Sequence, residues 1–214
     1  MSGIMLNLVG GTFGDSPPTV IGQAYGGGFY AGQIGVSSVA THYLVVGPAS
    51  SAVSTSVRWK TTNTSTTGTS SDIDGPTNSA NMNDASHPAA QFCEGLTIGG
   101  FSDWYMPAKN ELEVCYYNLK PTTLANDTGS GINPNAVPAR ASNYTAGTPA
   151  RTSATAFQSA GAQCFINQYY WSSTENSATD AWYQRVGKDA DTGQQAGLYK
   201  RYITNVRAVR RVAV

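Results

Sequence analysis

Short apolar runs bounded by glycine or proline predict β-strands between residues 20 and 60. Runs of this kind occupy residues 29–34 and 43–46. Residues 53–59 alternate instead, and their Ser and Thr content is typical of a half-buried strand. Residues 61–86 then consist almost entirely of Thr, Ser, Asn, Gly and Asp, which predicts a long loop.

Two helices are predicted after this loop. Pro88 suits the first turn of a helix over residues 87–97. A second helix is expected over residues 108–119, where apolar positions recur at helical spacing. Its apolar stripe consists of Leu112, Cys115, Tyr116 and Leu119. Glu111 and Glu113 are two positions apart on the same helix, so they are expected on different faces.

A second polar stretch, residues 122–165, contains few apolar side chains and is expected to form another long loop. A loop of this length inside a domain is unusual and often functional. The β pattern returns at residues 169–173, 181–186 and 206–212, with the last two on either side of a turn rich in Gly and Asp.

The composition adds that the surface carries little charge. The chain has 214 residues, of which only 12% are charged, and Lys+Arg equals Asp+Glu at 13 each. Its surface is therefore expected to be neutral, made of hydroxyl and amide groups over an aromatic core. A coiled coil, a membrane-inserted protein and a strongly basic nucleic-acid binder are excluded on these grounds.

The neutral total hides an asymmetry. Residues 185–214 hold seven basic side chains against two acidic ones. Two interpretations stay open: the arginines of the last strand lie along a packed surface or pair with acids from earlier in the chain, or they form a basic patch for an anionic ligand. The candidate ligand-binding residues are Tyr183, Arg185, Lys188, Tyr199, Lys200, Arg201 and Tyr202.

Catalytic and metal chemistry have little support in the sequence. The two histidines, His42 and His87, have no partner at the spacing of a catalytic triad or a metal site, so we expect neither an enzyme nor a metal centre. Residues 72–75 and 189–193 resemble fragments of calcium loops, but turn chemistry is the alternative for both. Three cysteines favour three buried thiols, with one disulfide and a leftover thiol as the alternative.

Several motifs occur together in a familiar order. GGFSDWYMP at residues 99–107 followed by ELE at 111–113 resembles the signature GGYxDWxLPxxxEL, and YWSSTE stands at 170–175, AW at 181–182 and VRAVR at 206–210. This set is similar to that of the DUF1566 family, which includes the C-terminal domain of the Legionella collagen-like adhesin and domains of phage tail-fibre proteins.

The resemblance implies an α+β, C-type-lectin-like fold: two helices, twisted antiparallel sheets, long loops, and paired N- and C-terminal strands. On this reading Trp104, Trp171 and Trp182 belong mainly to the core. Residues 21–214 would form the domain and residues 1–20 an apolar docking arm. The lectin motifs for calcium-dependent sugar binding are missing, so no cofactor is expected, with calcium as the weaker alternative.

The expected function is that of a non-enzymatic phage virion protein. It would sit in the tail fibre as a homotrimer, assembled in the host cytoplasm, and recognise a host cell-surface glycan or protein through loops. The arm would contact other virion tail proteins; nucleic acid and membrane insertion are not expected. The alternatives are a bacterial surface adhesin that binds anionic polysaccharide, and a structural subunit that decorates a capsid or fibre.

Overall fold

Two β-sheets carry the α+β fold in the computed structural model, which describes residues 16–187 and 192–214. The first sheet has the order β1-β2-β3-β9, and all its pairs are antiparallel. Its strands are β1 (Ala24–Tyr25), β2 (Gly28–Val36), β3 (Val39–Val46) and β9 (Val209–Ala213). The resemblance implied that the N- and C-terminal strands pair; β9 does join the first strands, but its partner is β3.

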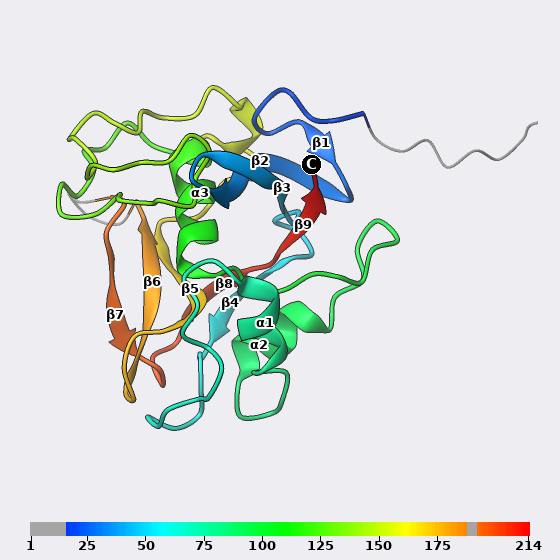
Figure 1. Ribbon diagram of the computed structural model, residues 1–214, viewed down its shortest axis with the longest axis vertical. Helices are drawn as coiled ribbons and strands as arrows, with labels where there is room; N and C mark the ends of the chain where they lie inside the picture. Colours follow the sequence, from blue (N-terminus) through cyan, green and yellow to red (C-terminus); the bar gives the residue numbers. More distant parts are fainter. Residues whose placement is uncertain (1–15, 188–191) are drawn as a thin grey trace, which may run out of the picture.

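The second sheet has the order β4-β8-β5-β6-β7 (Figure 1). Its strands are β4 (Val53–Val57), β5 (Gln168–Glu175), β6 (Asp180–Val186), β7 (Gln195–Tyr199) and β8 (Thr204–Arg207). β5 and β8 run parallel, and the other pairs are antiparallel. The sequence pattern did not reveal β7, because its five residues carry only one aliphatic side chain larger than alanine.

The strand predicted over residues 206–212 is in fact two strands, one in each sheet. The break falls at Ala208, whose amide donates to the Ala52 carbonyl at 2.9 Å while its own carbonyl accepts from the Gly47 amide at 2.9 Å. The alternation of apolar and charged residues lapses here, because Ala208 and Val209 are both apolar, but this lapse alone did not reveal the change of sheet. The segment therefore ties the two sheets together through one residue.

Three α-helices and a short 3₁₀ turn lie among the described residues, one α-helix more than predicted. They are α1 (Gly75–Ala80), α2 (Pro88–Glu94), α3 (Lys109–Leu119) and the turn η1 (Thr155–Phe157). α2 begins at Pro88 as predicted but ends three residues before the predicted boundary at 97. None of the helices in residues 16–187 and 192–214 has the length and apolar character needed to cross a membrane.

α1 lies inside the segment that was predicted to be a loop. It begins at an Asp74 side chain that accepts from the Thr77 amide at 3.3 Å, with a proline in its first turn. It buries Asn78 and Ser79 rather than an apolar stripe, and Asn78 Nδ2 donates to the Ser71 carbonyl at 2.7 Å. Hydrophobic periodicity could not find a helix that packs through amide and hydroxyl groups.

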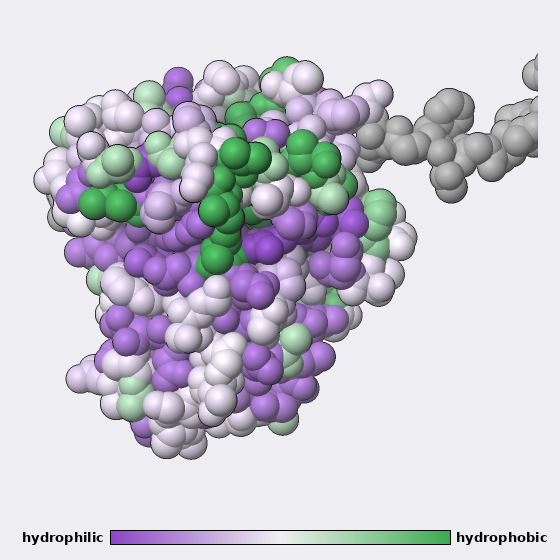
Figure 2. Space-filling model, in the orientation of Figure 1, coloured by the Kyte–Doolittle hydropathy of each residue, from purple (hydrophilic) through white to green (hydrophobic). Residues whose placement is uncertain are grey.

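α3 stands where the two sheets meet, and it contacts β2 on one side and β5 and β6 on the other (Figure 1). The predicted apolar stripe of α3 is buried, which confirms that assignment. Glu111 and Glu113 are buried as well, at 0% exposure each. In the space-filling view of the same face, apolar side chains gather in the upper half, and the lower half over α1 and α2 is mostly pale or purple (Figure 2).

The aromatic core is confirmed for most of the motif residues. Trp59, Trp104 and Trp171 are almost fully buried. The expectation for Trp182 is wrong, because this side chain is only half-buried and carries the Lys109 ammonium 4.1 Å from its ring centroid. The described cysteines are free thiols: Cys93 and Cys115 are buried, and Cys164 is half-buried rather than buried as predicted.

Candidate functional site

Five side chains meet at the end of β7 and line a surface hollow of about 330 Å³: Arg58, Asn63, Tyr199, Arg201 and Tyr202. This set is called the basic patch below. Tyr199 and Tyr202 are 61% and 51% exposed, which is unusual for large aromatic rings. Three of the residues, Tyr199, Arg201 and Tyr202, were candidates from the sequence.

Local backbone geometry brings the basic patch together. Tyr199 ends β7, and the Tyr202 amide closes a tight turn by donating to the Tyr199 carbonyl at 2.7 Å. Arg58 follows β4, and it points outward because Val57 and Trp59 on either side are buried. Arg58 Nε donates to the Arg201 carbonyl at 3.1 Å, which joins the two segments.

The basic patch carries positive charge without a matching acid. None of its lining residues is acidic. Within residues 16–187 and 192–214, neither Arg58 nor Arg201 has a carboxylate at ion-pair distance. Two guanidinium groups beside two exposed tyrosine rings form a surface that attracts anions and offers flat apolar faces.

Tyr183 and Arg185 do not belong to the basic patch. Both lie on β6, where Tyr183 pairs with Ala196, about 10 Å along β7 from Tyr199. The Tyr183 ring is buried against Tyr169, with 4.8 Å between the centroids, and its hydroxyl donates to Gln194 at 2.8 Å. The half-buried Arg185 lies over the Tyr169 ring at 5.9 Å. Lys188 lies outside the described residues.

Lys200 faces inward, although both of its neighbours in the chain face solvent. Its side chain is 0% exposed, and its Nζ donates to Glu175 Oε1 at 2.7 Å and to the Thr64 carbonyl at 3.0 Å. Burial lowers the pKa of this ammonium. Lys200 therefore stabilises the loop 61–86 from the protein interior. It is not placed to contact a ligand at the surface.

The arginines of the last two strands are packed or paired with acids from earlier in the chain. This is the first of the two interpretations that the sequence left open. Arg210 makes a bidentate pair with Asp103, at 2.7 and 2.8 Å. Arg211 Nε donates to Glu111 at 2.6 Å. Arg207 is almost fully buried and donates to the carbonyls of Gly47 and Gln163, and desolvation lowers its pKa to about 10. These arginines hold the fold together.

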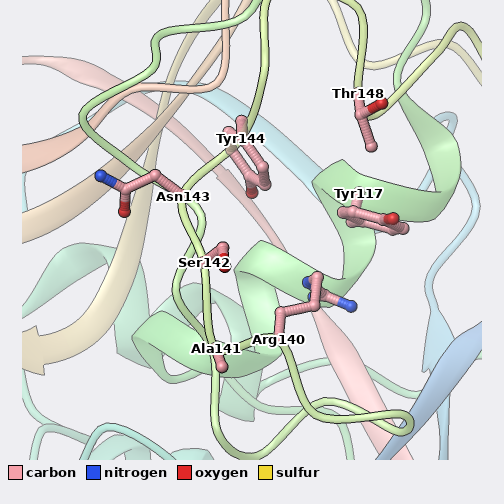
Figure 3. Close-up of a pocket in the computed structure, with 7 residues that line it drawn as sticks. All are labelled: Tyr117, Arg140, Ala141, Ser142, Asn143, Tyr144 and Thr148. Atoms are coloured by element: carbon pink, nitrogen blue, oxygen red, sulfur yellow. The ribbon is translucent and has the colours of Figure 1, made fainter.

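A second hollow, of about 220 Å³, lies in the other long loop (Figure 3). It is called the tyrosine pocket below, and its lining consists of Tyr117, Arg140, Ala141, Ser142, Asn143, Tyr144 and Thr148. Tyr117 comes from α3 and the other lining residues from residues 122–165. In Figure 1 the loops of 122–165 lie at the top and the end of β7 lies at the bottom, so the two hollows are far apart.

Glu113 fixes the wall of the tyrosine pocket from beneath. Its carboxylate is fully buried and accepts from Tyr144 Oη at 2.5 Å, from Asn133 Nδ2 at 2.5 Å and from the Arg140 guanidinium. Burial and the Glu113 carboxylate together raise the pKa of the Tyr144 hydroxyl well above its usual range. The predicted separation of Glu111 and Glu113 onto different faces is confirmed, since Glu111 binds Arg211 instead.

The structure gives the first of the two calcium-loop fragments other roles. Asp74 caps α1, and Asp72 lies 3.6 Å from the Lys109 ammonium. In the part of the chain that the structure describes, no three His, Cys, Asp or Glu side chains gather as a metal site would need. The second fragment overlaps residues 188–191, which lie outside the described part.

Sequence reasoning missed Arg58 and Asn63 in the basic patch and all of the tyrosine pocket. The alternation of Val57, Arg58 and Trp59 carried a usable signal, since it places Arg58 on the outer face. Arg140 and Tyr144 gave no such signal in the sequence. They lie in a loop without periodicity, and their partner Glu113 is 27 and 31 residues away, respectively.

A comparison with known families gives a match over most of the chain. Residues 51–210, about three-quarters of the chain, match the family described as the Lcl C-terminal domain. The match includes the whole second sheet, all the helices and both hollows. No curated protein matches the chain.

Proposed function

Because the chain belongs to the family of the Lcl C-terminal domain and carries an adhesin-like domain, we propose that it binds anionic polysaccharide at a cell surface through the basic patch. The observation that carries this proposal is the meeting of Arg58 and Arg201 with Tyr199 and Tyr202 in one hollow that has no acidic lining. We propose that the domain acts by binding alone, without catalysis or a metal.

Each part of the basic patch suits a different part of such a polymer. Guanidinium groups form paired hydrogen bonds with the oxygens of sulfate and carboxylate groups. Exposed tyrosine rings pack against the C–H faces of sugar rings, and Asn63 offers an amide to hydroxyl groups. Because the patch is shallow and exposed, its attraction for anions is expected to weaken as salt rises.

Dextran sulfate provides a direct test, with neutral dextran as its matched probe. We expect the protein to bind dextran sulfate at about 0.1 M salt, to lose that binding near 1 M salt, and to ignore dextran. Arg58→Ala with Arg201→Ala is expected to weaken binding by at least about tenfold. Arg151→Ala, which removes an exposed arginine elsewhere, is the control and should change little. Equal binding to both polymers, or an equal loss in the control, would contradict the proposal.

A phage tail fibre is the alternative setting, and it uses the same chemistry. Bacterial surfaces also display anionic polysaccharide, and the support for this setting is the resemblance of the sequence motifs to tail-fibre domains. A homotrimer that recognises the host and docks through residues 1–20 belongs to this alternative; residues 1–15 lie outside the described residues. Light scattering of the purified protein and competition with phage for host cells would test it.

We also propose that the architecture is C-type-lectin-like, as the resemblance implies. Its support is the position of β9 in the sheet of the first strands, together with two long loops, of which residues 122–165 carry the tyrosine pocket. Superposition of an experimental structure on lectin domains would test it; a different order of strands would contradict it.

A further inference from the structure

We propose that the tyrosine pocket is a binding site for one neutral sugar ring. This goes beyond the anionic polysaccharide proposed above and does not depend on it, because the two hollows share no residue. A volume of about 220 Å³ lies below the range of drug-sized sites and fits a single ring better than a length of polymer. The pocket opens to solvent, so the rest of a glycan could extend from the bound ring.

The apolar element of the site is a pair of tyrosine rings held in fixed positions. The rings of Tyr117 and Tyr144 are 6.2 Å apart and tilted by 39°. Arg140 stacks on the Tyr117 ring at 4.0 Å from its centroid. In Figure 3 the Tyr117 ring lies between Arg140 and Thr148, so the side of the ring toward Thr148 is not the side that the guanidinium covers. Rigid aromatic rings bury apolar area at a low cost in entropy.

The polar element comes from neutral side chains at the rim. Ser142 and Thr148 are exposed lining residues, and each carries a hydroxyl at the rim. A hydroxyl both donates and accepts, which matches the hydroxyl groups of a sugar without selecting for charge. In Figure 3 the Asn143 amide points away from the rings, so it is left free for contacts with a longer glycan rather than with the bound ring.

The charge balance separates this pocket from the basic patch. Arg140 is the only charged residue in its lining, and the buried carboxylate of Glu113 neutralises it. An anionic ligand would have to draw Arg140 away from Glu113 and leave that carboxylate buried without its charge partner, which is costly. The basic patch has no such counter-charge. The pocket therefore favours a neutral ring.

The pocket is also formed before any ligand arrives. Glu113 accepts hydrogen bonds from both Arg140 and Tyr144, so one buried carboxylate holds two of the walls. A wall that is already fixed loses little entropy on binding. This favours measurable affinity in spite of the small area that one sugar ring buries.

The test is a titration of the purified chain with methyl glycosides, followed by amide shifts in NMR. The neutral probes are the methyl glycosides of glucose, galactose, mannose and the two N-acetylhexosamines, and methyl glucuronide is the anionic probe. We expect at least one neutral glycoside to bind with a Kd of about 1–10 mM. The shifts should centre on residues 140–148 and stay the same between about 0.1 and 1 M salt.

Variants assign the binding to the pocket. Tyr117→Ala is expected to weaken it by about tenfold or more, and Tyr202→Ala in the basic patch should leave it unchanged. Thr148→Ala is the second pocket variant, used if Tyr117→Ala fails to fold. Its position is exposed, so it should fold and also weaken binding. The proposal is overturned if no neutral glycoside binds at about 50 mM, if the glucuronide binds better, or if the folded pocket variants bind as well as the unchanged chain.

Discussion

The two long polar loops, residues 61–86 and 122–165, have similar compositions but differ in how they contact the carboxylate beneath them. Each contacts one carboxylate, the partly buried Glu175 for the first and the fully buried Glu113 for the second. In the first loop, backbone groups make most of the contacts: the Thr64 carbonyl accepts from Lys60 and Lys200, and the Thr66 amide donates to Glu175. In the second loop, side chains make the contacts with Glu113.

This difference bears on how each loop tolerates change. A loop held through its backbone keeps its position when most of its side chains are replaced. Where a loop contacts its carboxylate through side chains, that contact depends on particular residues, here Asn133, Arg140 and Tyr144. Low aliphatic content therefore does not leave these segments without order, because buried ionic and polar contacts replace the apolar anchors they lack.

Glu113→Ala is expected to cause the largest loss. It leaves the Arg140 charge and the Tyr144 hydroxyl without their buried partner, which should lower the free energy of unfolding by about 3–5 kcal/mol. Urea denaturation measures the loss, and limited proteolysis should cut within residues 122–165. Asp72→Ala breaks the partly exposed pair with Lys109 and is the control, with an expected change below about 1 kcal/mol.

Lys200→Met should cost less, about 2–4 kcal/mol by the same measurement. The Thr66 amide and the Thr69 hydroxyl still donate to Glu175 when the ammonium is gone. The new cleavage sites should fall in residues 61–86 and leave residues 122–165 intact. Cleavage of both loops together would mean that they do not respond independently.

Acid should also distinguish the loop 61–86. Hydrogen bonds and ion pairing with Lys200 outweigh burial and lower the pKa of Glu175 below its usual 4.5. The folded state therefore holds fewer protons than the unfolded chain in this range, and its extra stability, present above about pH 4.5, fades as the pH falls through the folded pKa. Amide exchange in residues 61–86 should rise on acidification, and Glu175→Gln should flatten this dependence.

Thr64→Ala is expected to have the smallest effect, a change within about 0.5 kcal/mol. The Thr64 carbonyl accepts from both lysines, but its exposed side chain contacts only Thr62, at 3.0 Å between hydroxyls. Asn133→Ala is the matched change in the second loop and should cost more, because the Asn133 side chain itself reaches Glu113. Equal losses would remove the distinction between the two loops.

The sequence predicted the parts of the fold that rest on apolar periodicity. The stripe of α3 and most strands are examples. It did not predict α1, which buries Asn78 and Ser79, or the break at Ala208, which depends on backbone partners from distant segments. Among the candidate site residues, Lys200 shows most plainly what the sequence could not predict. Its neighbours Tyr199 and Arg201 are exposed, but the turn directs the Lys200 side chain inward to Glu175.

The single residue that joins β8 to β9 has a consequence for synthesis on the ribosome. β8 lies between β4 and β5, and β9 lies against β3, so the second sheet is incomplete until β8 has emerged and the first sheet until β9 has emerged. Until then, Glu111 and Asp103 also lack the arginines that pair with them. Chains that carry everything up to residue 203 would expose open strand edges to chaperones and proteases. Folding of this domain is therefore expected to be completed only once β8 and β9 have both left the ribosome.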